Sequence, residues 1–224
     1  MILRRAEQNR KGHVDVFYRS VTVKKTGKSG EAQIKILAVS TQLFAQYGYE
    51  GVAMRQIAKA AGITLPSIYH HFGNKEGLYR AVETSVYSTH TLSLMKALKS
   101  ADTPEENLRN FVGRLIFHLQ DDPLYLKILQ RGLIEGWEEN QTFLVEMSLQ
   151  KVFDELRNLL NECKPNGGES VLPIFIFSVI IGYLTMQPVT TKLKNYKFAT
   201  FPREQKQAIL TETILSLIQL NTLK

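Results

Sequence analysis

Hydrophobic residues recur in this chain at intervals of three and four positions, which is the spacing of amphipathic helices. In the first such segment, residues 31–47, Ile34, Leu37, Thr41 and Phe44 share one face. No convincing strand pattern follows residue 30. The spacing predicts further helices at about residues 52–60, 64–72, 75–99, 104–120, 123–137, 140–163, 171–186 and 203–220. The predicted fold class is therefore all-α, with about nine helices.

The short helices in the N-terminal third begin and end at five residues that favour helix ends and turns. Gly62 is suited to a turn because glycine adopts a positive φ without steric cost. Thr64 is a good N-cap, and Pro66 falls in the first turn of the next helix, where its missing N–H has no intrahelical partner. Gly73 ends that helix, and Asn74 caps the following one. Two short helices joined by a tight turn are typical of a helix-turn-helix DNA-binding motif.

At these residues the chain resembles the tetracycline-repressor (TetR) family of bacterial transcriptional regulators. The runs IAKAAGIT and SIYHHFGNKEGLY are similar to the second helix, turn, recognition helix and fourth-helix start of that family. The upstream run FAQYGYEGVAMRQIA also fits, so the resemblance covers about residues 31–80. It departs at Val52 and Ala53, where the family usually has Thr or Ser capping the second helix. The resemblance implies a three-helix DNA-binding domain, then a larger helical domain that binds a small effector and dimerises through its last two long helices.

The resemblance also implies roles for particular side chains. The positions that look like phosphate contacts are Thr64, Ser67, Tyr69 and Lys75, and those that look like base-reading positions are Leu65, Pro66 and His70. Hydroxyl, phenol and ammonium groups are suitable phosphate partners, and small apolar groups suit a thymine methyl. Because this recognition helix has no Arg, Asn or Gln, Arg55 of the preceding helix is a further base-contact candidate. The alternative is a three-helix packing unit without a DNA role.

Charge is concentrated at the N-terminus. The 224 residues carry a net charge of +7, and the pI near 9.4 suggests a polyanionic partner. Residues 1–30 hold eight basic and two acidic side chains, which gives +6 for that segment alone. This basic arm is interpreted either as a DNA-contacting arm or as a solvated tail or an extension upstream of the true start codon. The predicted domains are the arm at 1–30, the DNA-binding domain at 31–75 and an effector-binding and dimerisation domain at 76–224.

Several classes of protein are disfavoured. Cys163 is the only cysteine, so it forms no intrachain disulfide or cysteine-based zinc site, and this fits a cytoplasmic location. No signal peptide is evident, and the apolar run Val171–Met186 is short for a membrane span and contains Pro173 and Gly182. Because phosphate loops, nucleophile elbows and metal-ligand motifs are missing, we predict no enzyme activity, no cofactor, no metal and no membrane partner.

The second domain is expected to dimerise through its last helices. The helix at 171–186 is apolar nearly all round, so it has to be covered on all sides. A second subunit is the favoured cover, and burial wholly within one monomer is the alternative. The candidate interface residues are Phe175, Val179, Ile180, Leu210, Ile214 and Leu217.

An effector pocket should be mainly apolar with a few polar groups. The candidates are Phe111, Leu115, His118, Arg131, Trp137, Phe143, Phe177 and Tyr183. His118 is interpreted as a core histidine in preference to a ligand contact. Arg131 is interpreted as an ion-pair partner of Glu135, one helical turn away, in preference to an anion-binding group.

The leading hypothesis is a homodimeric, ligand-responsive repressor that a small apolar or aromatic effector releases from a palindromic operator in double-stranded DNA. The effector would act by its differential affinity for two states of the dimer. The alternative is a DNA-binding protein without a small-molecule response, acting through a protein partner or as an architectural factor. An enzyme using His118, Glu135 or Glu138 is a weaker third hypothesis.

Overall fold

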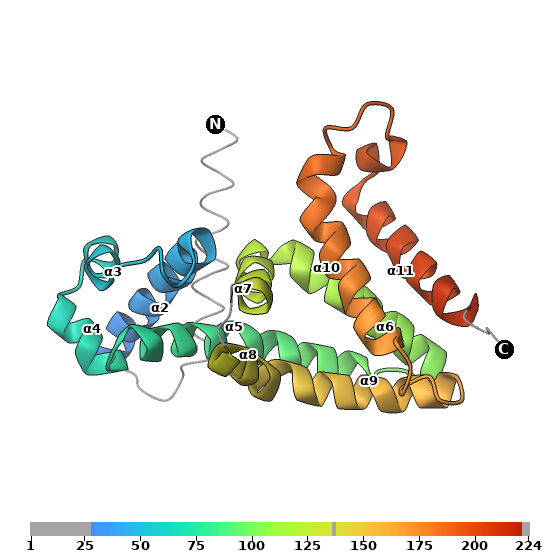
Figure 1. Cartoon of the computed structure of the whole chain (residues 1–224), viewed down its shortest axis with the longest axis horizontal. Helices are drawn as coiled ribbons and strands as arrows, with labels where there is room; N and C mark the ends of the chain where they lie inside the picture. The colour runs from blue at the N-terminus through green and yellow to red at the C-terminus, as the bar shows by residue number, and fades with distance from the viewer. Residues whose placement is uncertain (1–27, 136–137, 221–224) are drawn as a thin grey trace. The chain divides into compact units, whose positions relative to one another are not determined.

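The computed structural model describes residues 28–135 and 138–220, most of which lie in helices (Figure 1). The helices are α2 (Lys28–Tyr47), α3 (Met54–Ala61), α4 (Leu65–Phe72), α5 (Lys75–Ala97), α6 (Pro104–Asp121), α7 (Pro123–Ile134), α8 (Glu138–Leu144), α9 (Gln150–Cys163), α10 (Leu172–Thr190) and α11 (Arg203–Leu220). A π-helical turn, Val145–Leu149, joins α8 to α9, and a 3-10 turn, Lys197–Thr200, precedes α11. The described residues contain no strand, and the predicted all-α class is confirmed.

Two predicted helix descriptions are wrong in detail. The single helix expected at 140–163 contains the π-helical turn that separates α8 from α9. Pro188 was expected in the connection after 171–186, but α10 continues through it to Thr190. The helix tolerates Pro188 because the missing N–H removes one bond near its end, and the last turn still closes with Thr191 N–H donating to Gln187 O at 3.2 Å.

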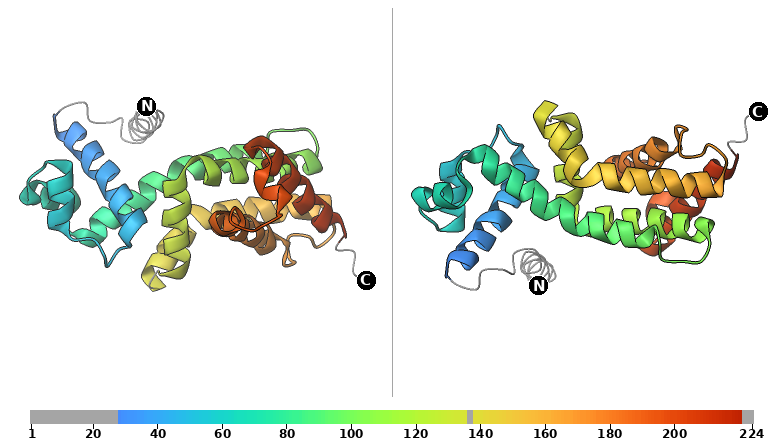
Figure 2. Two further views of the ribbon diagram at one scale, coloured as in Figure 1. Left: turned by 90° about the horizontal axis from the view of Figure 1, so that it is seen from above. Right: turned by 90° about the horizontal axis from the view of Figure 1, so that it is seen from below.

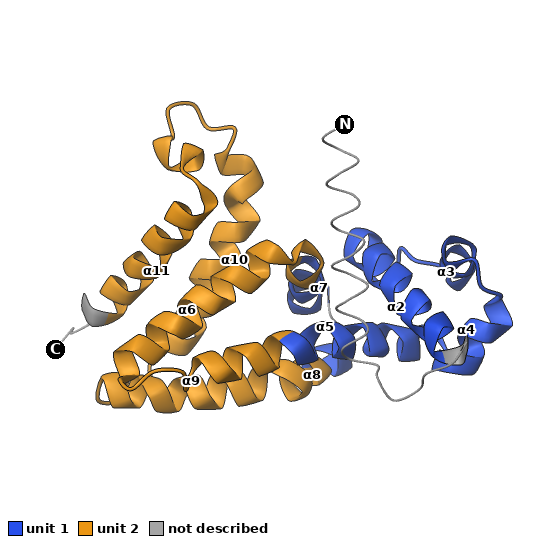
Figure 3. Ribbon diagram, turned by 180° about the vertical axis from the view of Figure 1, so that it is seen from behind, with its two compact units in different colours: residues 1–89, 127–141 blue, residues 90–126, 142–224 orange. Residues whose placement is uncertain are grey.

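The chain divides into two compact units, which Figure 3 colours separately. Unit 1 comprises residues 1–89 and 127–141, and unit 2 comprises residues 90–126 and 142–224. This division by contacts differs from the predicted boundary at residue 75. Residues 75–89 of α5 and residues 127–141 (segment 127–141) belong to the same unit as α2, α3 and α4. Residues 1–27, which form most of the predicted basic arm, lie outside the described residues.

In unit 1, α3 packs on α2, and the buried face of α3 consists of Met54, Ile57, Ala58 and Ala61. Aromatic rings close the core beside it. Phe44 meets Tyr79 edge-on, with 5.0 Å between ring centroids, and both side chains are buried. This core holds the short helices α3 and α4 in place.

Arg131 ties segment 127–141 to the end of α2. Its guanidinium donates to Ala45 O at 3.1 Å and to Gln46 O at 2.8 Å, and it pairs with Glu135 at 2.5 Å. Carbonyls in the last turn of a helix have no intrahelical partner, so Arg131 caps α2. Gly48 follows with φ of +73°, and a Cβ there would lie 2.7 Å from the Arg131 guanidinium. The predicted Arg131–Glu135 ion pair is confirmed, and it belongs to unit 1.

In unit 2, α6 packs against α9, α10 and α11, and α9 also packs against α10. The contact between α6 and α9 lies within unit 2, and Figure 2 shows the molecule from above and from below. The core face of α6 consists of Leu108, Phe111, Val112, Leu115, Ile116 and Leu119, all buried. Arg203 lies 3.4 Å from Asp121, and Gln207 donates to Gly113 O at 3.1 Å, so α11 runs antiparallel to α6.

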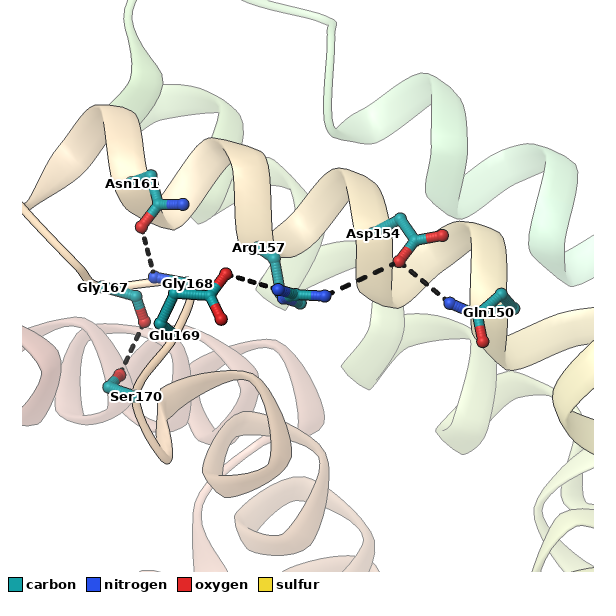
Figure 4. A network of polar contacts seen from close by, with 8 residues as sticks. All are labelled: Gln150, Asp154, Arg157, Asn161, Gly167, Gly168, Glu169 and Ser170. Carbon is teal, nitrogen blue, oxygen red and sulfur yellow. Dashed lines mark hydrogen bonds and ion pairs between the residues drawn. The ribbon is translucent and has the colours of Figure 1, made fainter.

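The connection between α9 and α10 is fastened to α9, as Figure 4 shows. The Gly168 N–H donates to Asn161 Oδ1 at 2.8 Å, and Arg157 pairs with Glu169. A Cβ on Gly168 would lie 2.2 Å from the backbone oxygen of Arg157. Glycine is therefore required here by the close approach of two backbones. The run KPNGGE, residues 164–169, lies in this connection, which fixes where α10 begins.

By length and composition, α10 is the one helix of the described ranges that passes the test for a membrane span. About a third of its apolar window is buried in the structure (33%). Core helices of water-soluble proteins pass the same test, so this finding is weak evidence for a membrane.

Candidate nucleic-acid interface

The turn between α3 and α4 has the predicted geometry. Gly62 adopts the left-handed conformation, with φ of 62° and ψ of 38°. The N–H of the next residue, Ile63, donates to Ala58 O at 3.0 Å and completes the C-terminal cap of α3. Ala53, at the N-cap of α3, makes no side-chain capping bond, so the departure from the family pattern has a structural counterpart. Backbone hydrogen bonds, and no capping side chain at Ala53, therefore close the ends of α3.

A single fully buried residue, Ile68, anchors α4 to the core, while its opposite face is open. Tyr69 is 43% exposed, and Pro66 and His70 are exposed beside it. Thr64 holds the N-cap position, but its hydroxyl makes no capping bond to the helix. Such a helix contributes little to packing and is short enough to enter a major groove.

All predicted DNA-contacting residues lie on α3, on α4 with its N-cap, or at the first position of α5. The exposed ones are Arg55, Thr64, Pro66, Tyr69 and His70, and the half-buried ones are Leu65, Ser67 and Lys75. The start of α5 is capped as predicted, because Asn74 Oδ1 accepts from Gly77 N–H at 2.7 Å.

Sequence reasoning missed Tyr49, which supports Lys75. The Lys75 ammonium lies 4.4 Å from the centroid of the Tyr49 ring, within the range of a cation–π contact. The ring is itself held edge-on against Tyr79, with centroids 5.2 Å apart, and burial raises the pKa of the Tyr49 hydroxyl. The available signal was the aromatic pair Tyr47 and Tyr49 around Gly48, just before α3.

Replacing Tyr49 with Leu is expected to weaken DNA binding by roughly two- to fivefold, because an exposed cation–π contact is worth about 0.5–1 kcal/mol. Tyr49→Phe keeps the aromatic face and should bind as the wild type does. Titration at one fixed salt concentration measures both. Equal affinity of the Leu variant and the wild type would refute a positioning role for Tyr49.

The predicted effector residues do not form one cluster. Phe177 packs on Phe111 at 6.0 Å and stacks on Phe153 at 4.7 Å between ring centroids, so these rings fill the core of unit 2. Tyr183 meets Phe198 at 6.1 Å, elsewhere on α10. Of the remaining candidates, Leu115 is buried on α6, Phe143 is half-buried on α8, Arg131 caps α2 in unit 1, and Trp137 lies outside the described residues.

His118 has the surroundings of a core histidine. Its ring meets His90 edge-on, with centroids 4.8 Å apart, and it also contacts Phe117. Burial lowers the pKa of His118 to about 4, so the ring is neutral at pH 7. Within the described ranges, its Nε2 is buried without a hydrogen-bond partner. A neutral imidazole with one open nitrogen can bind a polar group of a ligand but cannot hold an anion by charge.

One hollow in unit 2 has a volume of about 230 Å³. It is lined by Leu98, Lys99, Ala101, Asn107, Glu155, Asn158, Leu159 and Glu162. None of these is a predicted effector residue, and their mixed charge does not suit an apolar ligand. The described residues also contain no group of three or more His, Cys, Asp or Glu side chains placed to hold a metal ion.

The predicted dimer residues divide into two sets. Ile180, Leu210 and Ile214 are buried within unit 2, so its own core already covers them. Phe175 and Val179 are half-buried, and Leu217 is 40% exposed. The more exposed apolar residues of α10 are Ile174, Met186 and Val189. A partner surface on α10 therefore lies on a different face of this helix from the buried Ile180.

These features define a helix-turn-helix, formed by α3 and α4, and a second, larger helical unit. Residues 36–82 match the family model described as bacterial regulatory proteins, tetR family. This match confirms the resemblance of residues 31–80 to that family.

Relatives of known name support this assignment. The HTH-type transcriptional regulatory protein RaaS of Mycobacterium tuberculosis is 31% identical over 116 residues, which are 48% of this chain and 54% of RaaS. RutR of Escherichia coli is 30% identical over 118 residues, which are 51% of this chain and 55% of RutR. This chain therefore spans just over half the length of these relatives. Their names favour a regulator over an enzyme.

The fold extends further than the sequence similarity. The transcriptional regulator FadR from Bacillus subtilis, solved in complex with stearoyl-CoA, has a TM-score of 0.66 at 19% identity, covering 83% of this chain and 96% of FadR. FadR from Bacillus halodurans has a TM-score of 0.66 at 20% identity, covering 89% of this chain and 99% of that one. At this identity the likeness shows a shared fold.

Proposed function

We propose that this protein is a homodimeric transcriptional repressor that leaves a palindromic operator when a small apolar or aromatic effector binds. The observation that carries the proposal is the α3–α4 unit, whose exposed residues are those that the family resemblance assigns to DNA. A recognition helix held by one buried residue presents its other side chains to a major groove. The acting residues would be Thr64, Ser67, Tyr69 and Lys75 on phosphates and Arg55, Leu65, Pro66 and His70 at bases.

The exposed face of α10 supports a dimer. Ile174 is 56% exposed and Val189 is 51% exposed, and both lie on one helical face with Ser178, Gly182 and Thr185 between them. A Cβ on Gly182 would meet no atom within 4 Å, so this face is open at its centre. Apolar ends with small residues between them allow close approach of a second helix. A second copy of the chain would cover this stripe and place a second reading head on the operator.

The effector is proposed from the core of unit 2. The Phe111, Phe153 and Phe177 rings, with the neutral His118 on the same helix as Phe111, offer an apolar site with a polar group. The rings contact one another directly, so an effector would have to separate them. Stearoyl-CoA, which is bound in the Bacillus subtilis FadR structure, is a reasonable first compound to test.

The same packing favours a second candidate function. Aromatic side chains that contact one another in the core leave no preformed space for a ligand between them. The protein would then bind DNA without a small-molecule response and act through a protein partner.

The proposal is tested by a gel-shift titration against the DNA upstream of its own gene, at a stated salt concentration, with random DNA of equal length as the control. A truncation lacking residues 1–30 is titrated in parallel. Tight binding to the upstream DNA alone, kept by the truncation, supports a specific regulator. Equal weak binding to both DNAs, lost with the arm, means that the +6 arm drives non-specific attraction and contradicts the proposal.

A further inference from the structure

Unit 1 buries an acidic residue that the DNA-binding proposal does not use. Glu83, on α5, has no exposed surface. Within the described residues, its carboxyl oxygens make no hydrogen bond of good geometry, and the same is true of both side-chain polar atoms of Asn140, which is 1% exposed. A buried carboxylate without strong partners is expensive, and such a group becomes neutral where it can.

The groups around Glu83 come from α5 and from segment 127–141. The Asn140 amide, the Arg80 guanidinium and the Tyr87 hydroxyl favour the ionised form, but burial outweighs them and raises the pKa of Glu83 to about 7. Arg80 is also engaged by Glu76 at 3.0 Å, which divides its charge between two carboxylates.

Two further charged groups, Glu135 and Arg131, lie near enough to change the pKa of Tyr79. Burial, Glu83 and Glu135 raise the pKa of the Tyr79 hydroxyl, and Arg131 opposes them, so this phenol stays neutral. Because Arg131 forms an ion pair with Glu135, the carboxylate of Glu135 largely neutralises its charge. Arg80 and Arg131 are the cations that these contacts identify near Glu83 and Tyr79. Each is already paired with another glutamate, so neither fully compensates an ionised Glu83.

Protonation changes what the carboxyl group can do. A neutral carboxyl can donate its O–H to the Asn140 carbonyl oxygen and accept from the Asn140 amide, whereas an ionised one only accepts. The Tyr87 hydroxyl, which lies 3.5 Å from Ile128 O, joins α5 to the same segment. Glu83 and Tyr87 of α5 thus both meet polar groups of residues 127–141.

We propose that Glu83 is a proton-linked switch in unit 1. Its neutral carboxyl holds residues 127–135 and 138–141 against α5, and its ionisation releases them. Segment 127–141 carries Arg131, the cap of α2, so its release loosens the unit that presents α4. The switch goes beyond the proposed function, and its effect on DNA affinity rests on that function.

The sign of the pH dependence follows from linkage. An acid whose folded pKa is raised stabilises the closed form fully below its ordinary pKa of 4.5, and this contribution is lost as the pH rises through about 7. The two values correspond to a change of up to about 300-fold in the ratio of closed to open forms. The closed form is therefore favoured in acid and weakened at alkaline pH.

Hydrogen–deuterium exchange of the full chain at pH 6 and pH 8 tests the switch, with labelling times scaled for the intrinsic exchange rate. The amides of residues 127–135 should exchange up to about tenfold faster at pH 8 in the wild type, and equally at both pH values in Glu83→Gln. Glu139→Gln, at an exposed neighbour of Asn140, is the matched control and should follow the wild type.

A wild type without this pH dependence, or a Glu83→Gln variant that keeps it, would overturn the switch. The unfolding midpoint in urea provides a second readout on the same samples, and Glu83→Gln should remove its decline between pH 6 and pH 8. Titration with the upstream DNA is run in parallel. DNA binding that is absent at both pH values contradicts the proposed function, while the exchange data still decide the switch.

Discussion

The double variant Ile174→Glu/Val189→Glu is expected to be monomeric and to bind a two-half-site operator at least about a hundredfold more weakly than the wild type. The two residues mark the ends of the exposed stripe on α10, and both are more than half exposed in a single chain. In a symmetric dimer each substitution occurs twice, so four carboxylates would be forced into an apolar interface. A single reading head keeps its phosphate contacts but loses the gain from binding two half-sites at once.

Size-exclusion chromatography with light scattering measures the oligomeric state, and titration of a palindromic DNA measures the affinity. Leu92→Glu is the matched control, because Leu92 is an apolar residue of α5, outside the stripe on α10, and is 65% exposed. It should remain dimeric. A double variant that stays dimeric would move the interface to another surface, and the proposal for α10 would then be wrong.

The reading helices could be predicted from the sequence because local rules decide them. Gly62, Thr64 and Pro66 allow few other conformations, and Asn74 bonds to a residue three positions away. The anchor of α4 was also predictable, since Ile68 is the apolar position of a short helix whose neighbours are mostly polar.

The dimer and effector residues were harder to predict because they depend on packing between distant segments. An all-apolar helix has no periodicity that tells a core face from an exposed one, so Ile180 could not be separated from Ile174. Only one of the two contacts of Arg131 could be predicted from the sequence. Its bond to Glu135 follows from i,i+4 spacing, but its bond to Ala45 O joins positions far apart in sequence.

Glu83 illustrates the same limit more sharply. On α5 it reads as an ordinary polar residue of a long helix, and its burial comes from the return of segment 127–141 to unit 1. A sequence pattern reports the helix but not the segment that covers it. A buried acid of this kind is found only when the tertiary structure is known.

Gly168→Ala is expected to lower the free energy of unfolding by about 2–3 kcal/mol, the cost typical of atoms forced into a packed site. The new Cβ would lie 2.2 Å from the Arg157 backbone oxygen and 2.8 Å from its carbonyl carbon. No side-chain rotation relieves this contact, so the loop would have to move away from α9. That movement would also strain the Gly168–Asn161 hydrogen bond of 2.8 Å.

Thermal unfolding followed by circular dichroism should show a midpoint lower by roughly 5–10 °C. Gly113→Ala provides the control, because a Cβ there would approach only the flexible Gln207 side chain, at 4.0 Å, inside helix α6. It should be neutral or stabilise by about 0.5–1 kcal/mol. Because the loop fixes the start of α10, Gly168→Ala should also weaken the dimer more than Gly113→Ala does. A Gly168→Ala protein as stable as the wild type would show that the loop is not bound closely to α9.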